Sequence, residues 1–342
     1  MIKRTFAFLF FLVIGIILFV SVIANTGIDS ISQSLEKFSL INFIFLLFLS
    51  LVNFALFTLR WDIILHHHHT TKKVPFYRLF LHRMSCFAVS YLTPAAATGG
   101  EPVRIFFLQE DGVRTGDAVS STVIDKVFEF TALTLFIFSG VLVSIIDGSV
   151  FSGKTEIMLG VFILMFGGLI FWFYYSTIKK IGFFSSLFRF MRLNKIKRFA
   201  KYEDGIIRVE NQMTLFYTHH LRKFIFLMAI SLATVFFMVL EHYLVALFMG
   251  VKLTFFQSFL AATIPGISYI IPVPGALGML EGSHAAIFGI LGVSINVFVF
   301  VLILRLRDII FVLIGLAHAS KHGIQMILKS FTNGKTTKNS DL

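Results

Sequence analysis

The sequence YLTPAAATGGEPVR, residues 91–104, and the sequence YIIPVPGALGMLEG, residues 269–282, decide the fold of this chain. Each stretch begins with a tyrosine, passes through a proline and a glycine-containing turn, and reaches a carboxylate, Glu101 or Glu281. Each is followed by a short apolar stretch and then by a long apolar segment that carries charges. A hydrophobic chain that repeats a broken segment in this way is typical of the two halves of a membrane transporter.

The composition indicates a membrane protein. Of the 342 residues, 57% are hydrophobic and 14% are charged, and the mean hydropathy is +0.87. A soluble domain of this length cannot bury so much apolar surface, so most of it faces lipid or other helices. The single cysteine, Cys86, excludes an internal disulfide and a cysteine-rich metal site. Excess Lys and Arg in a membrane protein is a topology signal, so we expect no nucleic-acid partner.

We expect an all-α polytopic membrane protein with about six full spans and two inverted re-entrant helical hairpins, or about eight helices by conventional counting. A full span needs about 20 apolar residues. The expected spans are about 5–24, 38–59, 118–146, 157–176, 224–249 and 295–320. A cleaved signal peptide is the alternative for the first of them. The hairpins are expected at about 79–109 and 256–293, where proline and glycine interrupt apolar sequence, and such backbone is tolerated in a membrane only against protein or water.

Basic residues predict the topology. The segments expected outside, 25–37, 147–156 and 250–255, hold three Lys or Arg, whereas the loop 177–223 alone holds eleven. Both termini are therefore expected in the cytoplasm. The first hairpin is then entered from the cytoplasm and the second from outside. The repeats, about 79–146 and 256–320, would have opposite topology. A chance recurrence of Pro-Gly kinks is the alternative, since the spacing from proline to glutamate differs between the copies.

The two motifs resemble those of the flippase-like membrane domain found at the N-terminus of lysylphosphatidylglycerol synthases, a family that also has many stand-alone members. The resemblance covers about residues 5–325 and implies a flippase-like transmembrane domain over 1–325, followed by a polar cytoplasmic tail, 326–342. It also implies movement of a lipid, often an anionic or aminoacylated phospholipid, between leaflets. The fused synthases carry a soluble aminoacyl transferase domain after the membrane part. This chain ends at Leu342, so on that pattern we expect no enzyme activity.

The first motif offers candidate head-group contacts. Backbone N–H groups of Gly99 and Gly100 suit a phosphate if a half-helix begins there. Arg104, one turn further, is able to bind a phosphate through two N–H groups. Glu101 is a candidate to bind an amine, to restrain Arg104 or to accept a proton. The alternative is that the glycines only permit a tight turn and that Glu101 and Arg104 pair with each other.

The long charged spans supply a second set of candidates. Asp125 and Glu129 share one helix face and would repel each other unless one is protonated or a cation intervenes. Lys126 is placed to pair with Glu129, and Arg305 and Asp308 repeat the three-residue spacing. Ionisable groups at this depth are costly and usually face a bundle interior. They are predicted to line a substrate or ion pathway, or else to lock the hairpins in place. Glu281 belongs to this set, and three further residues are weaker candidates: Arg83, Glu241 and His242.

Three other features carry less weight. The loop 177–223 reads as an amphipathic basic helix on an anionic leaflet, with Arg189, Arg192, Lys195, Lys197, Arg198 and Lys201 between aromatic residues. The run His66–His69 reads as a solvated loop rather than a metal site. The tail from about residue 330 reads as disordered. No nucleotide-binding or hydrolase motif occurs, so we expect neither a cofactor nor ATP-driven transport by this chain alone.

The sequence therefore predicts a multi-pass protein of the cell (inner) membrane. We expect a flippase or transporter for an anionic or aminoacylated phospholipid or a polyprenyl-phosphate-linked lipid. The site is expected where the two hairpins meet near the midplane. Its expected partners are membrane lipids, and a homo-oligomer or a lipid-modifying enzyme remains open. An accessory subunit for a lipid- or glycan-modifying enzyme is the alternative, and an enzyme using Glu101 and Asp125 as acid and base is a third hypothesis. Lipid identity, direction, coupling ion and oligomeric state stay open.

Overall fold

The computed structural model describes residues 39–66, 73–93, 99–147, 154–196, 203–219, 221–270 and 273–336. These ranges form eleven α-helices and no strand, which confirms the all-α prediction. The helices are α3 (Leu40–Leu65), α4 (Phe76–Leu92), α5 (Glu101–Glu110), α6 (Thr115–Asp147), α7 (Lys154–Ile178), α8 (Phe183–Phe190), α10 (Glu203–His219), α11 (Leu221–Phe248), α12 (Phe255–Thr263), α13 (Met279–Ile290) and α14 (Val297–Thr336). The expected first span, 5–24, lies outside the described residues.

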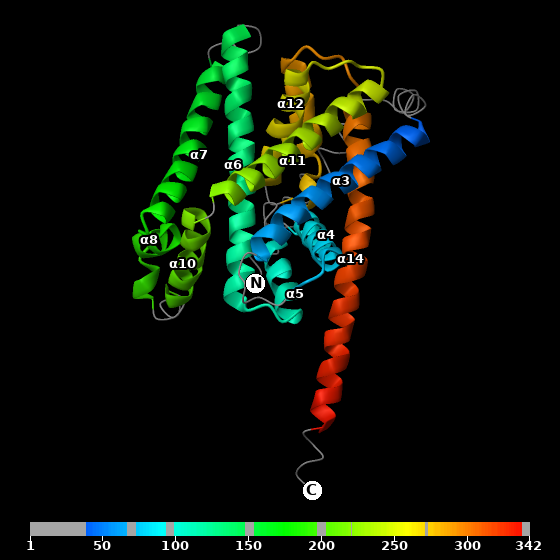
Figure 1. Ribbon diagram of the computed structural model, residues 1–342. Coiled ribbons are helices and arrows are strands. Elements are labelled where there is room, and N and C mark those ends of the chain that lie inside the picture. The colour runs from blue at the N-terminus through cyan, green and yellow to red at the C-terminus, as the bar shows by residue number, and fades with distance from the viewer. Residues whose placement is uncertain are drawn as a thin grey trace.

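The long helices form a bundle (Figure 1). α3 and α11 lie side by side and run in opposite directions, oblique to α6 and α14. α4 packs along α14, while α7 and α10 lie beside α6. By length and composition, α3 and the Arg222–Phe248 part of α11 are each able to cross a membrane. Their exposed side chains are largely apolar, including Phe45 and Phe48 on α3, as expected for surfaces that meet lipid.

The first broken segment is a helix–break–helix unit, as predicted. α4 ends at Leu92, and α5 begins at Glu101 with a proline in its first turn, a position that a helix tolerates because that N–H has no partner in any case. The two helices pack against each other. We call this unit the first hairpin. Its motif residues 94–98 lie outside the described part of the chain.

The second broken segment is also helical on both sides of its break. A capping box of Thr254 and Gln257 starts α12, which passes into the 3-10 turn η2 (Ile264–Ile270). A second short turn, η3 (Pro274–Ala276), precedes α13. Gly275 and Gly278 have φ angles of 58° and 75°, which glycine adopts without strain. We call this unit the second hairpin; whether the two hairpins re-enter the membrane from opposite sides stays a prediction.

The tips of the two hairpins touch each other, as the sequence analysis expected. A Cβ atom on Gly275 would lie 2.8 Å from the ring of Tyr91, at the end of α4. The Tyr91 hydroxyl in turn accepts a hydrogen bond of 3.2 Å from Arg305 on α14. The two copies of the motif therefore meet inside the bundle.

Two sequence predictions outside the bundle are wrong in part. The loop 177–223 does not hold one continuous basic helix: α8 ends at Phe190, and Arg192 adopts a left-handed φ of 56° before the short turn η1 (Leu193–Lys195). The loop instead contains α10, which was not predicted, and Glu210 of α10 accepts hydrogen bonds from two backbone N–H groups at the start of α8. At the other end, α14 continues to Thr336, so the tail is helical that far.

Candidate functional site

Seven charged side chains from four helices meet where the first hairpin packs against α3 and α6. Four are cationic and three are carboxylates. We call this set the arginine cluster: Arg60 of α3, Arg83 of α4, Glu101 and Arg104 of α5, and Asp125, Lys126 and Glu129 of α6. Five of them, Glu101, Arg104, Asp125, Lys126 and Glu129, are candidates from the first motif and the charged span that follows it, so the structure brings the charged candidates of the first half together.

Asp125 lies at the centre of the arginine cluster and is fully buried. Its Oδ1 atom accepts from Arg60 Nε at 2.7 Å, and its Oδ2 atom accepts from Arg83 and Arg104, each at 3.0 Å. Arg60 and Arg83 also reach Glu129, both at 3.7 Å. The predicted repulsion between Asp125 and Glu129 is thus resolved by cations that lie between them.

The other edge of the arginine cluster is more open. Lys126 binds Glu129 at 2.9 Å and lies 3.3 Å from Glu101, which confirms the predicted Lys126–Glu129 pair. Glu101 and Arg104 also pair, at 3.5 Å. The side chains of Glu101, Lys126 and Glu129 are 16%, 21% and 29% exposed, whereas those of Arg60 and Asp125 have no exposure. A ligand would therefore approach from the Lys126 edge.

The arginine cluster has more hydrogen-bond donors than its own carboxylates use. Within the described ranges, Arg60 Nη2, Arg104 Nη2 and Arg104 Nε are buried without a hydrogen-bond partner. The guanidinium of Arg104 lies over the ring of Trp61, 4.2 Å from its centroid, which fixes its plane. Buried unpaired donors are costly, and together with one surplus positive charge they favour binding of an anion.

Gly100 is placed by packing rather than by an anion. Its N–H donates to Ser90 Oγ at 2.9 Å. A Cβ atom at this position would lie 1.9 Å from the carbonyl oxygen of Cys86, so glycine lets α5 approach the α4 backbone. This favours the tight-turn alternative for Gly100. Gly99 lies at the same turn, partly buried.

The candidates Glu281 and Arg305, from the second motif and the span after it, form a separate group, which we call the hairpin lock. Arg305 of α14 binds both carboxylate oxygens of Glu281, at 2.6 and 2.9 Å. It also donates to the carbonyls of Gly275 and Ala276, at 2.8 and 3.3 Å. The guanidinium is thus committed to the turn of the second hairpin. This matches the alternative that these charges hold a hairpin in place.

Asp308 does not join Arg305. It binds its neighbour Arg307, whose Nη2 lies 2.8 Å from Asp308 Oδ1, and Arg307 also pairs with Glu241 of α11. The ion pairs that Arg305 and Asp308 form therefore do not follow from their three-residue spacing along α14. Glu241, a weaker candidate in the sequence, ties α11 to α14.

Sequence reasoning missed Arg60. The expected span 38–59 stops one residue before Arg60, whereas α3 continues to Leu65. The signal that identifies it is the return of apolar sequence after the charge, Trp61 and then Ile63–Leu65 beyond Asp62, which extends the helix past Arg60. Arg83 was only a weaker candidate, yet it contacts both Asp125 and Glu129.

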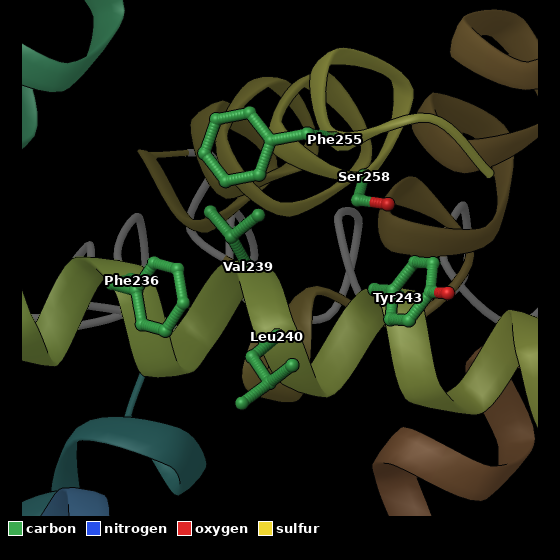
Figure 2. Close-up of a pocket in the computed structure, with 6 residues that line it drawn as sticks. All are labelled: Phe236, Val239, Leu240, Tyr243, Phe255 and Ser258. Carbon is green, nitrogen blue, oxygen red and sulfur yellow. The ribbon is translucent and has the colours of Figure 1, made fainter.

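An apolar groove lies between α11 and α12, away from both charged groups (Figure 2). It has a volume of about 240 Å³ and is lined by Phe236, Val239, Leu240, Tyr243, Phe255 and Ser258. In Figure 2 Val239 of α11 lies below the ring of Phe255 on α12, and the ring of Tyr243 lies below Ser258. Such a lining suits hydrocarbon and offers no cationic partner for a phosphate.

Comparison with known proteins agrees with the resemblance of the motifs. The family described as "Lysylphosphatidylglycerol synthase TM region" matches residues 7–315. A UPF0104 membrane protein of Methanothermobacter thermautotrophicus is 28% identical over 345 residues, which cover 95% of each chain. A further match, to a protein of the same description and organism, is 32% identical over 117 residues and covers 33% of each chain. No solved structure matches. Since the family covers nearly the whole sequence, the chain is a helical membrane protein that belongs to the family of lysylphosphatidylglycerol synthase transmembrane regions.

Proposed function

We propose that this protein moves an anionic lipid between the leaflets of a membrane and that the arginine cluster holds the phosphate of the head group on its way. The observation that carries the proposal is that Arg60 Nη2, Arg104 Nε and Arg104 Nη2 are buried without a hydrogen-bond partner among the described residues, although Arg60 Nη2 lies 3.7 Å from Glu129 and Arg104 Nε lies 3.5 Å from Glu101. A charge inside a membrane protein is costly, so a surplus of cations there indicates a function. Guanidinium groups are well suited to phosphate because they bind it through two N–H groups.

The neighbouring carboxylates fit the same role. Asp125 holds three guanidinium groups in one place without a ligand. A phosphate that arrives at the Lys126 edge adds acceptors for the unpartnered N–H groups, and Glu101 is near enough to receive an amine of an aminoacylated head group. In this proposal the chain carries the lipid and changes no covalent bond.

The second hairpin supports an architecture of inverted repeats. Glu281 and Arg305 are 24 residues apart, and the same interval separates Glu101 from Asp125. In both copies an ion pair joins the second arm of the hairpin to the long helix that follows, Arg104 to Asp125 and Glu281 to Arg305. Repeats with opposite topology are the basis of alternating access in many transporters.

Charge distribution supports an inner-membrane location with cytoplasmic termini. α5, α8 and α10 lie toward one end of the bundle, and α14 extends beyond that same end (Figure 1). The basic stretch around Arg189 and Arg192 belongs to this end, and basic segments remain on the cytoplasmic side.

The test is lipid movement in proteoliposomes that contain the purified full chain. Fluorescent phosphatidylglycerol and a fluorescent polyprenyl phosphate are the probes, and the variants are Glu101→Gln and Arg104→Ala. We expect the wild type to move at least one probe and Arg104→Ala to abolish that movement while it elutes as a folded protein. The exposed residue Arg189 supplies the matched control, Arg189→Ala, which should move lipid at the wild-type rate.

Failure of the wild type to move either probe, with or without an ion gradient, would contradict the proposal. A tight partner recovered from the native membrane would then favour the accessory-subunit alternative. Chemical conversion of the probe by the purified chain would favour an enzyme instead.

A further inference from the structure

Two buried histidines face each other outside the arginine cluster and the hairpin lock. His242 of α11 and His284 of α13 are stacked, with ring centroids 5.9 Å apart and ring planes 5° apart. They are 8% and 1% exposed. Phe300 of α14 packs against both rings, at 5.9 and 5.5 Å. The pair therefore lies at the contact of α11, α13 and α14, inside the second half of the chain.

Hydrogen bonds fix which nitrogen of each ring is free. The Nδ1 atom of His242 lies 2.9 Å from the carbonyl oxygen of Met238, and that of His284 lies 2.8 Å from the carbonyl oxygen of Leu280. A carbonyl only accepts, so Nδ1 carries the hydrogen in both rings and Nε2 is left with a lone pair. In the described part of the chain, His284 Nε2 is buried without a hydrogen-bond partner. An unsatisfied buried acceptor is costly and needs an explanation.

The break in the second hairpin supplies an acceptor for a proton at this position. Pro265 has no N–H, so it cannot give the usual helical hydrogen bond to the carbonyl of Ala261 in α12, whereas the N–H of the preceding residue, Ile264, makes its own regular bond to Leu260. The Ala261 carbonyl is an acceptor for the His284 ring once Nε2 is protonated. The imidazolium form would thus donate to two carbonyls, one on α13 and one on α12.

The charges that face the pair are already compensated. Glu281 and Arg305 act on His284, and they bind each other in the hairpin lock. Arg307 acts on His242 and is paired with Glu241 and Asp308. Two stacked imidazolium rings would repel each other, so the pair has room for one proton. Histidine is the side chain whose ordinary titration lies nearest to physiological pH.

We propose that His242 and His284 form a binding site for a single proton, which couples a pH gradient to lipid movement. This rests on the proposed function. A proton from water on one side binds the Nε2 lone pair of His284 and donates to the Ala261 carbonyl, which draws α12 and α13 together. When the proton leaves to water on the other side, that link is lost and the second hairpin is free to rearrange. The arginine cluster binds the lipid, and the histidine pair sets the direction.

The test measures leaflet asymmetry of fluorescent phosphatidylglycerol in proteoliposomes with a pH gradient of about one unit. At one proton for each lipid, such a gradient supports at most about a tenfold asymmetry, since one pH unit is a tenfold ratio. We expect the wild type to build asymmetry toward that limit, and His284→Gln and His242→Phe to build none. The control is His318→Gln, on the far part of α14 against His82, which should keep the wild-type response.

The outcomes separate this proposal from the proposed function. Lipid movement by the wild type at the same rate and with no asymmetry, whether or not the gradient is present, would overturn the histidine site and leave the lipid transporter standing. If no probe moves at all, ¹⁵N NMR of histidine-labelled protein decides the matter. We expect the His284 Nε2 signal to titrate within the pH range spanned by the gradient and its titration to shift in His242→Phe. A signal that shows no protonation within that range overturns the proposal.

Discussion

The carboxylate of Glu281 receives two hydrogen bonds from the guanidinium of Arg305, at 2.6 and 2.9 Å, while the same guanidinium binds two carbonyls at the turn of the second hairpin. A side chain with this many partners has little capacity for a substrate. In the arginine cluster, by contrast, buried guanidinium N–H groups of Arg60 and Arg104 lack hydrogen-bond partners within the described residues. The two copies of one motif thus support different roles, one structural and one suited to an anion.

The hairpin lock makes a prediction about stability. Arg305→Ala removes one partner of a buried ion pair and leaves Glu281 uncompensated, a change that typically costs about 3–5 kcal/mol. Thermal unfolding in detergent should show a clear loss of stability. Tyr91→Phe removes only the hydroxyl that accepts from Arg305 at 3.2 Å, so its cost should stay near about 1 kcal/mol. Equal unfolding temperatures for wild type and Arg305→Ala would show that the lock contributes nothing.

The close approach of the first hairpin predicts a position-specific effect of alanine. In Gly100→Ala the new methyl group would overlap the backbone oxygen of Cys86, at 1.9 Å. Backbone cannot yield as a side-chain end can, so we expect destabilisation of at least about 1–3 kcal/mol. Gly282→Ala is the matched control, since nothing lies within 4 Å of a Cβ atom there. Detergent-resistant, monodisperse protein should be recovered from Gly282→Ala and lost from Gly100→Ala. Wild-type recovery of both would argue against the packing of α5 on α4.

Asp125 is expected to be required for folding as well as for the site. Asp125→Asn leaves the three guanidinium groups that contact this carboxylate without their shared counter-ion, and breaking a buried ion-pair network of this kind costs about 3–5 kcal/mol. Asp204→Asn, at an exposed position of α10, should leave stability unchanged. The measurement is the midpoint of thermal unfolding of both purified variants. A midpoint for Asp125→Asn equal to that of Asp204→Asn would contradict the central role of this carboxylate.

Much of the fold could be predicted from the sequence because lipid imposes simple rules. Long apolar runs became α3, α6, α7, α11 and α14, and the prolines and glycines of the two motifs interrupt helices as expected. Helix ends were less certain, because a span that leaves the membrane loses its apolar signal before its hydrogen bonds end. That is why the predicted span stops before Arg60, whereas α10 lacks the apolar run that predicts a span, because its sequence EDGIIRVENQMTLFYTH is largely polar.

The pairing of charges could be predicted only where partners lie on one helix. The three-residue spacing of Lys126 and Glu129 predicts an ion pair between them, and the structure confirms that pair. The ion pair between Arg305 and Glu281 joins two different helices. Spacing along a single helix indicates only Asp308 as a neighbour of Arg305, so it could not predict this pair. Which arginines surround Asp125 depends on how three other helices pack against α6, and no local pattern in the sequence contains that information.

The most direct test of the central claim is the selectivity of lipid movement in proteoliposomes. Initial rates are compared for fluorescent phosphatidylglycerol, which is anionic, and fluorescent phosphatidylcholine, which is zwitterionic, with Arg104→Gln beside the wild type. If the arginine cluster holds the head-group phosphate of an anionic lipid, the wild type moves phosphatidylglycerol faster, and Arg104→Gln loses that preference by about tenfold or more, the effect of one charge-assisted hydrogen bond of 1.5–3 kcal/mol. Equal wild-type rates for the two lipids, or a preference that survives in folded Arg104→Gln, would contradict the account.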